Sequence, residues 1–135
     1  MSILLDTHVL IWAATNSPLL RPSAREILGD PSESIFISSV SALELAIKWS
    51  IRKLSLPKPP SEFIAEFLEV SGFSQLAMSV RDAGAVEALP LFHKDPFDRV
   101  LVAQARNHGL RLMTADPILE RYDVDVIALW LDDDE

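Results

Sequence analysis

The 135-residue sequence has no cysteine, only four glycines and one tyrosine, and no apolar run near the roughly 18 residues that a membrane-spanning helix needs. Without cysteine, the chain can form no disulfide, no thiolate zinc site and no thiol nucleophile. The N-terminal segment "MSILLDTHVL" has no Lys or Arg and meets an acid at position 6, so we expect no signal peptide. These absences predict a cytoplasmic protein without a membrane segment.

The chain also has fewer basic than acidic residues. Twelve Lys and Arg residues stand against twenty Asp and Glu residues, which gives a formal charge of −8. This is the wrong sign for a protein that holds nucleic acid by bulk electrostatic attraction. Four of the acids form the terminal "DDDE". We therefore expect residues 132–135 to be a solvated acidic tail and residues 1–131 to form one domain with its own core.

Short apolar segments alternate with segments of helical periodicity along the chain. The pattern predicts strands at residues 2–5, 34–38, 74–79, 110–114 and 124–130. It predicts helices at residues 7–14, 39–51, 62–71, 80–89 and 96–108, and a short helix after Asp116. Ser61 is expected to cap the third helix and Gly72 to end it. Strands that are mostly followed by helices indicate an α/β fold, in which a parallel sheet of four to five strands is covered on both faces.

Two acids directly follow predicted strands. Asp6 ends the first strand, and Asp116 follows the strand "LRLMT". Open parallel sheets carry their sites beyond the carboxyl ends of the strands, so both side chains are expected at one edge if these strands are neighbours. The alternative role for each acid is a helix N-cap, with Pro117 at the first helical position after Asp116. The residues alone leave both roles open.

The segment "HKDPFDR", residues 93–99, places Asp95 and Asp98 at the start of a predicted helix. Asp95 as N-cap, followed by Pro96 and then by Asp98 at the third helical position, resembles a capping box. At helical spacing, however, Asp98 lies on the apolar face that the helix is expected to turn inward. Asp98 is therefore a better candidate for a binding role than Asp95.

Glu44 falls within an apolar stripe of the helix predicted at residues 39–51. The stripe consists of Val40, Leu43, Ile47 and Ile51. Glutamate is rarely found unpaired at such positions, because burial of a carboxylate is costly. The alternative is a surface ion pair with Lys48, which is worth only about 0.2 to 0.5 kcal/mol. That is small beside the cost of desolvation, so we expect a further role for Glu44.

Together, the strand ends and inward helix faces are expected to bring four carboxylates to one rim: Asp6, Glu44, Asp98 and Asp116. Two unit charges about 4 Å apart cost about 4 kcal/mol at an effective dielectric near 20, so such a cluster must take up protons or bind cations. An all-oxygen ligand set suits Mg²⁺ or Mn²⁺ rather than zinc. One or two such ions can activate water and stabilise charge on phosphate oxygens. The cluster therefore predicts phosphodiester hydrolysis without a protein nucleophile.

Four segments carry these acids, and they cover nearly the whole chain in a fixed order: "LLDTHVLIW", "ISSVSALELAIK", "HKDPFDRVLVAQA" and "LMTADP". This ordered set resembles the PIN-domain ribonucleases and, among them, the VapC-type toxins of prokaryotic toxin–antitoxin pairs. The resemblance implies a Rossmann-like three-layer sandwich and a Mg²⁺- or Mn²⁺-dependent endoribonuclease that acts on RNA. It also implies a homodimer and inhibition by a VapB-type antitoxin. By match to the motifs, Asp6, Glu44, Asp98 and Asp116 take the places of the acidic quartet, and Asp95 stays a possible fifth ligand.

The other candidates for RNA contact are basic side chains. Arg99 is expected either to contact phosphate or to pair with Asp95. One basic run is expected to contact the RNA backbone, with a solvated face as the alternative: Lys48, Arg52, Lys53 and Lys58. The scattered histidines have no Ser or Cys partner that would indicate a triad, so capping or surface roles are expected for His8, His93 and His108. The tryptophans lie in no basic setting, and core or interface roles are expected for Trp12, Trp49 and Trp130.

Two other functions are compatible with the same residues. Phosphoryl transfer through an aspartyl phosphate also uses an Asp after the first strand. Here that Asp is followed by "TH" rather than by a second acid two residues on, and no lysine ends a late strand. The alternative from a different class is a protein-binding module whose acids are only caps and surface pairs. Such a module predicts no effect of divalent ions on stability.

Overall fold

The structure is a computed structural model that describes residues 1–131; the expected acidic tail, 132–135, lies outside the described residues. Five parallel strands form one sheet in the order β3-β2-β1-β4-β5. Their bounds are β1 Ser2–Leu5, β2 Ser34–Ser38, β3 Ser74–Leu76, β4 Arg111–Thr114 and β5 Val126–Ala128. The α-helices are α1 Thr7–Ala14, α2 Pro22–Leu28, α3 Ser39–Ser50, α4 Pro60–Ser71, α5 Val80–Gly84 and α6 Pro96–His108. Two 3₁₀ helices complete the fold, η1 Ala85–Ala88 and η2 Pro117–Arg121. The predicted α/β architecture is confirmed.

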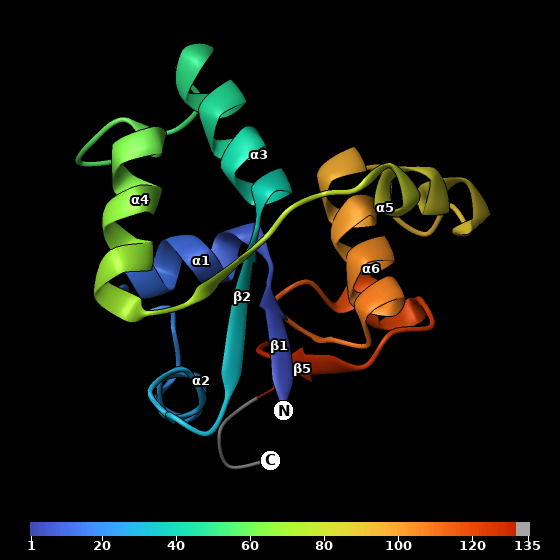
Figure 1. The fold of residues 1–135 in the computed structure, drawn as a ribbon, viewed down its shortest axis with the longest axis horizontal. Helices are drawn as coiled ribbons and strands as arrows, with labels where there is room; N and C mark the ends of the chain where they lie inside the picture. Colours follow the sequence, from blue (N-terminus) through green and yellow to red (C-terminus); the bar gives the residue numbers. More distant parts are fainter. Residues whose placement is uncertain (132–135) are drawn as a thin grey trace.

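Helices cover both faces of the sheet (Figure 1), with α1, α2 and α4 on one side and α5 and α6 on the other. The alternation of side chains along β1 supplies both cores: Ile3 and Leu5 pack toward α1 and α4, whereas Leu4 packs toward α6. All three side chains are fully buried. A central strand that is buried on both faces explains why its sequence reads as a continuous apolar run.

Because β1 lies between β2 and β4, its carboxyl end lies beside the carboxyl ends of both neighbours. β1 pairs with β2 on one side and with β4 on the other, and Leu5 lies in register with Met113. The backbone N–H of Asp6 continues this ladder by donating to the Met113 carbonyl at 3.1 Å. The residues that follow β1, β2 and β4 therefore meet at the same edge of the sheet.

Several local expectations were wrong. Helix α4 begins at Pro60, and its N-cap Pro59 offers no side-chain acceptor, so Ser61 is not the cap. Strand β3 ends at Leu76 and β5 at Ala128, because only those residues pair with a neighbouring strand. Helix α2 was not predicted; it is short and buries only Ala24, although the proline at its first position is a typical start signal.

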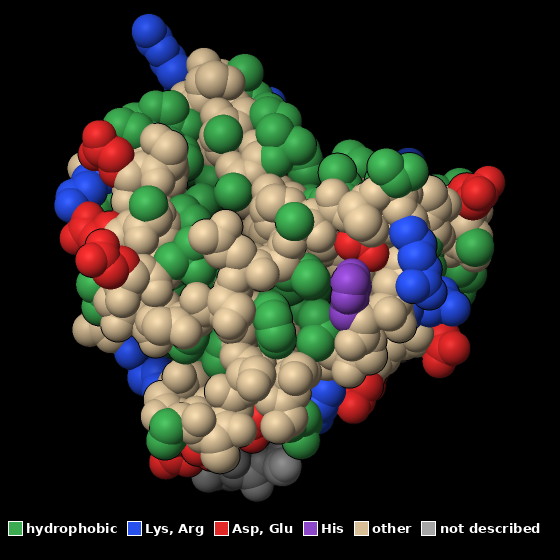
Figure 2. Space-filling view, viewed as in Figure 1, with side chains coloured by type: hydrophobic (Ala, Val, Ile, Leu, Met, Phe, Trp, Pro, Cys, Tyr) green, Lys and Arg blue, Asp and Glu red, His purple; other side chains and the backbone are tan. Residues whose placement is uncertain are grey.

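Of the four residues of the apolar stripe predicted at 39–51, Val40 is buried and the other three do not face inward. Leu43, Ile47 and Ile51 are exposed, whereas the buried face of α3 includes Glu44 and Leu45. Helix α3 projects beyond the carboxyl end of β2 (Figure 1), so the sheet cannot cover the outer side of its later turns. Figure 2 shows hydrophobic side chains at the surface over α3 and α4. Within residues 1–131, none of the helices combines the length and hydropathy required to cross a bilayer.

Candidate active site

Asp6 is held at the junction of β1 and α1. Its Oδ1 accepts the backbone N–H of Val9 at 2.9 Å, as an N-cap does, and its Oδ2 accepts the hydroxyl of Thr114 at the end of β4. Burial raises the pKa of Asp6, although the hydrogen bonds from Thr114 and Val9 lower it. The capping role that the sequence left open is thus present, but the carboxylate is also buried beside other acids.

Asp116 lies two residues beyond β4, on the same edge of the sheet. Its Oδ1 accepts the N–H of Ile118 at 3.0 Å and so caps η2. Its Oδ2 lies 2.9 Å from Nε2 of His93. The backbone N–H of Asp116 donates to Thr114 Oγ1 at 3.0 Å, so one threonine hydroxyl connects the loops of Asp6 and Asp116. The expectation that these two acids share an edge is confirmed.

Glu44 is buried on α3, with 3% of its surface exposed. Lys48 Nζ lies 2.6 Å from Glu44 Oε2, so the predicted i, i+4 pair exists. The other oxygen, Oε1, is buried without a hydrogen-bond partner among the described residues. Such an orphaned carboxylate oxygen is costly to bury, and a bound cation would offset that cost. Helix α3 is fixed near Asp6 by the 3.0 Å hydrogen bond from Thr7 Oγ1 to Ser41 Oγ.

Asp98 lies on the first turn of α6 and faces the other acids. Desolvation, together with the negative charges of Asp95, Asp6 and Glu44, raises the pKa of Asp98 to about 7. His93 opposes this effect from 3.2 Å. The direction of the shift indicates that these carboxylates lie within electrostatic reach of one another, and that the cations among residues 1–131 do not fully offset their charge.

Asp95 has the N-cap role that the sequence suggested. Its Oδ1 accepts the N–H groups of Phe97 at 2.8 Å and of Asp98 at 3.3 Å. It remains close enough to raise the pKa of Asp98. Asp95 is therefore a helix cap whose charge adds to the cluster, and a fifth ligand role for it stays a prediction.

His93 is the site residue that sequence reasoning missed. A capping or surface role was expected, but its ring contacts both Asp98 and Asp116 and is only 19% exposed. His93 lies two residues before the N-cap Asp95, and its ring nitrogen Nδ1 accepts the Asp95 N–H at 3.0 Å. Scattered spacing in the sequence conceals such a contact, because Asp116 lies 23 residues away.

A hollow of about 350 Å³ opens beside these acids. Its lining consists of Asp6, His8, Trp12, Asp98, Ala115, Asp116 and Pro117. Trp12 was expected only as a core or interface anchor; it packs against the core as a partly buried side chain and also lines this hollow. The carboxylates of Asp6, Asp98 and Asp116 thus line an open hollow, as a reaction site requires, whereas Glu44 is not part of this lining.

The donor set fits a hard divalent cation. Ligand atoms of His93, Asp98 and Asp116 lie within 4.8 Å of one another. The orphaned oxygen of Glu44 and the raised pKa of Asp98 both point to missing positive charge in the same region. Carboxylate oxygens in this number are the ligands that Mg²⁺ and Mn²⁺ prefer.

Arg99 does not occupy either of its predicted positions. Its guanidinium is buried and donates to the carbonyls of Val86, Leu89 and Pro90 at 2.9–3.2 Å. It therefore stabilises the loop before α6 and is not available to phosphate. Of the other candidate RNA contacts, Lys48 pairs with Glu44 and Lys58 with Glu66, while Arg52 and Lys53 are exposed just after α3.

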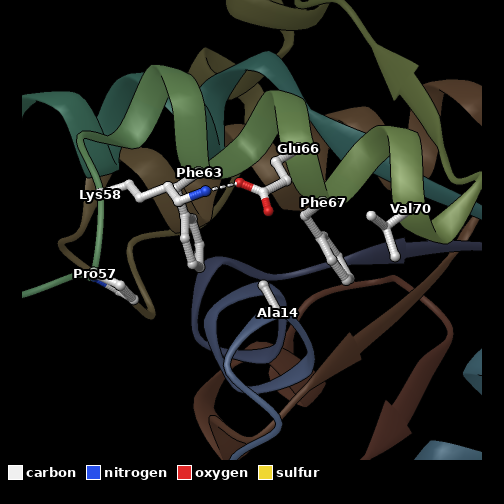
Figure 3. A pocket seen from close by; sticks show the side chains of 7 residues that line it. All are labelled: Ala14, Pro57, Lys58, Phe63, Glu66, Phe67 and Val70. Atoms are coloured by element: carbon white, nitrogen blue, oxygen red, sulfur yellow. Dashed lines mark hydrogen bonds and ion pairs between the residues drawn. The ribbon is translucent and has the colours of Figure 1, made fainter.

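A second, more apolar hollow of about 260 Å³ lies between α1 and α4 (Figure 3). Phe63 and Phe67 of α4 point toward Ala14 of α1, and Lys58 bonds Glu66 beside them (Figure 3). Glu66 is the only carboxylate in the lining, so this hollow lacks the ligand set found at the sheet edge.

Comparisons with known proteins agree with this fold. The family model described as the PIN domain matches residues 3–125. The chain is 29% identical over 116 residues to Ribonuclease VapC22 of Mycobacterium tuberculosis, a match that covers 85% of this chain and 87% of that protein. The fold is similar to a chain in the structure of VapBC2 from Rickettsia felis bound to a promoter DNA fragment, with a TM-score of 0.71, 18% identity and coverage of 95% and 98%. FitAcB from Neisseria gonorrhoeae gives a TM-score of 0.62 with 21% identity and coverage of 95% and 98%.

Proposed function

Since this chain belongs to the PIN-domain family, we propose that it is a metal-dependent endoribonuclease and the toxin of a VapBC-type toxin–antitoxin pair. The observation that carries the proposal is the buried, unpartnered Oε1 of Glu44 beside three further carboxylates. The ribonuclease name of the curated relative supports the choice of RNA as substrate. The two hydrogen-bonded oxygens of Asp6 do not favour its use as a nucleophile, which argues against an aspartyl phosphate.

Asp6, Glu44, Asp98 and Asp116 would hold one or two Mg²⁺ or Mn²⁺ ions. When bound, such an ion activates water and stabilises negative charge on phosphate oxygens. The protein's part is to hold the ligand oxygens in place before the substrate arrives. Asp6 is fixed by the α1 amide and Thr114, and Asp116 is fixed by the η2 amide and His93.

We propose two protein partners. A second copy of the chain would cover the exposed apolar residues Leu43 and Ile47 of α3 and its C-cap Ile51. A VapB-type antitoxin would present Arg or Lys to the acidic rim, where unneutralised carboxylates attract a basic segment. Light scattering should show a dimer that Ile47→Glu converts to a monomer, and a dimer that survives this change would contradict the first assignment. Loss of the antitoxin complex on Asp98→Asn would support the second, whereas an unchanged complex would exclude the rim.

The direct test is incubation of the protein with a panel of structured RNAs, with and without Mn²⁺. The proposal expects Mn²⁺-dependent cleavage by the wild type and none by Glu44→Gln or Asp98→Asn. Asp82→Asn is the matched control, because Asp82 is a buried acid on α5 outside the hollow. Cleavage without metal, or equal cleavage by Asp98→Asn, would contradict the proposal.

A further inference from the structure

His93 lies in the loop before α6 with both ring nitrogens engaged. Nε2 is 2.9 Å from Oδ2 of Asp116 and 3.2 Å from Oδ2 of Asp98. Nδ1 accepts the backbone N–H of Asp95 at 3.0 Å. The ring therefore bridges Asp98 of α6 and Asp116 of the β4–η2 loop. These two segments are distant in sequence and lie together only in the folded chain.

The hydrogen bond at Nδ1 determines the tautomer. A ring nitrogen that accepts an N–H directs its lone pair at the donor and carries no hydrogen. The neutral imidazole of His93 consequently carries its hydrogen on Nε2, the nitrogen that faces the two carboxylates. Both contacts at Nε2 are thus donated by one N–H group to Oδ2 of Asp98 and Oδ2 of Asp116.

The main chain of His93 is also held. Its N–H donates to Tyr122 Oη at 2.9 Å, and its carbonyl accepts from Arg99 Nη1 at 3.4 Å. The same Nη1 donates to the Pro90 carbonyl at 2.9 Å. Because these contacts fix the loop on folding, little entropy remains to be lost when His93 orients the acids.

We propose that His93 is a positioning residue: its Nε2–H gathers the carboxylates of Asp98 and Asp116 onto one point for a divalent ion, without itself being a ligand. The inference rests on the proposed function. Its Nε2 lies close enough to the acids to be a ligand atom itself. Coordination through Nε2 would require that nitrogen to lose its hydrogen while Nδ1 still accepts the Asp95 N–H, and a neutral imidazole cannot meet both conditions.

Two substitutions separate the two ends of the ring. In His93→Gln the amide nitrogen reaches the position of Nε2 and can still donate to the acids. In His93→Asn the amide oxygen reaches the position of Nδ1, can accept the Asp95 N–H in an Asx turn, and leaves the acids without a donor. Comparison of the two variants therefore separates the hydrogen bonds that His93 donates to the acids from its effect on the loop conformation.

The experiment is calorimetric titration of each folded variant with Mn²⁺, without RNA. Loss of an outer hydrogen bond to a metal ligand weakens metal binding about 10–100-fold, which we expect for His93→Asn. His93→Gln should stay close to the wild type. Equal affinities in all three proteins, or a larger loss in His93→Gln, would overturn the inference. A wild type that binds Mn²⁺ but cleaves no RNA would overturn the proposed function alone.

A second measurement uses the wild type only, in case a variant does not fold. ¹⁵N NMR of the His93 ring reports which nitrogen carries the hydrogen. We expect the Nε2–H tautomer without metal and an unchanged tautomer with saturating Mg²⁺. Loss of the Nε2 hydrogen on addition of Mg²⁺ would make His93 a ligand and overturn the positioning role.

Discussion

Two centres on the α5–α6 side of the sheet pair an aspartate with a histidine, and they are built in opposite ways. In the first, Asp82 of α5 is buried and receives hydrogen bonds from Asn107 at 3.0 Å and from His108 at 3.1 Å, both on α6. Gln104 Nε2 and the backbone N–H of Ser79 donate two further hydrogen bonds to Asp82 Oδ2, at 3.3 and 3.1 Å. Burial raises the pKa of Asp82, but these bonds outweigh it and hold the pKa well below its usual range.

In the second centre, Asp98 meets His93 among other acids. Burial and the charges of Asp95 and Asp6 raise its pKa to about 7, and the His93 contact does not offset them. One nearby oxygen, Oε1 of Glu44, has no partner among the described residues.

This difference is what we expect between an acid that stabilises the fold, Asp82, and an acid of the proposed metal site, Asp98. Asp82 is surrounded by donors, so its negative charge stabilises the packing of α5 on α6. Within the described residues, the cluster around Asp98 has too few nearby cations to balance its carboxylates. The resulting repulsion is located at the edge of the sheet, where a ligand can reach it. Burial raises the pKa of both acids, with 20% of the Asp98 side chain and 1% of Asp82 exposed, so the surrounding donors and charges make the difference.

The largest expected difference between the two centres is in RNA cleavage, when each aspartate is replaced by asparagine. Asp98→Asn removes a proposed metal ligand and should lower the rate of RNA cleavage at least about 100-fold. Asp82→Asn should leave the rate of the folded protein nearly unchanged. Single-turnover cleavage assays measure both, and comparable losses in the two variants would refute the distinction.

The same two variants should reverse their order in stability. Asp82→Asn replaces a charged acceptor of several hydrogen bonds and should lower the free energy of unfolding by about 2–3 kcal/mol. Asp98→Asn should not destabilise the metal-free protein at neutral pH, because it removes a repelled charge. Urea denaturation in the presence of a chelator measures the difference. A destabilised Asp98→Asn with an unaffected Asp82→Asn would reverse the assignment.

Acidity should act on the two centres with opposite sign. The pKa of Asp98 is about 7 in the folded protein and 3.8 as a reference for the unfolded chain, so its stabilising protonation is complete below about pH 4 and lost as pH rises toward 7. Asp82 behaves inversely: its contribution is present above its unfolded value of 3.8 and is lost as pH falls below it. Metal-free wild type should lose about 2 kcal/mol between pH 5 and 8, which is less than full conversion of the shift because Asp98 is partly exposed.

The control for this pH effect is Asp98→Asn. Its stability between pH 5 and 8 should be flatter than that of the wild type, and saturating Mg²⁺ should flatten the wild-type curve in the same way. An identical slope in both proteins without metal would show that Asp98 is not the titrating group.

Most of the fold follows from local sequence signals. Strands that are buried on both faces give apolar runs, and helices α4 and α6 end at Gly72 and Gly109, whose φ angles of 73° and 65° favour glycine. The four acids follow from the rule for parallel strands and from the cost of a buried carboxylate. Each of these signals lies within a few residues of the feature that it predicts.

Two of the errors involve contacts between segments that only the folded chain brings together. Arg99 bonds carbonyls of the preceding loop, and His93 bonds Asp116, because residues 85–95 fold back over the start of α6. No periodic pattern records such a loop. The exposed stripe of α3 has another cause: periodicity reveals that Leu43 and Ile47 share a face but not whether the fold covers it.

The smallest expected effect concerns cations outside both centres. Arg52 and Lys53 are exposed after α3 and have no role in either acid–histidine pair. Their replacement by Gln should raise KM for RNA by a small factor on all sequences and reduce the salt dependence by about one unit of slope per lost phosphate contact. Unchanged salt dependence would assign both residues to a solvated face.

The most direct test of the central claim is thermal unfolding during titration with Mn²⁺. The wild type should be stabilised progressively, by about 2.7 kcal/mol at a hundredfold excess over Kd. Asp82→Asn should start from a lower melting temperature and show the same increase, whereas Glu44→Gln should show little. A wild-type melting temperature that does not respond to Mn²⁺, or an equal response in Glu44→Gln, would contradict the metal centre.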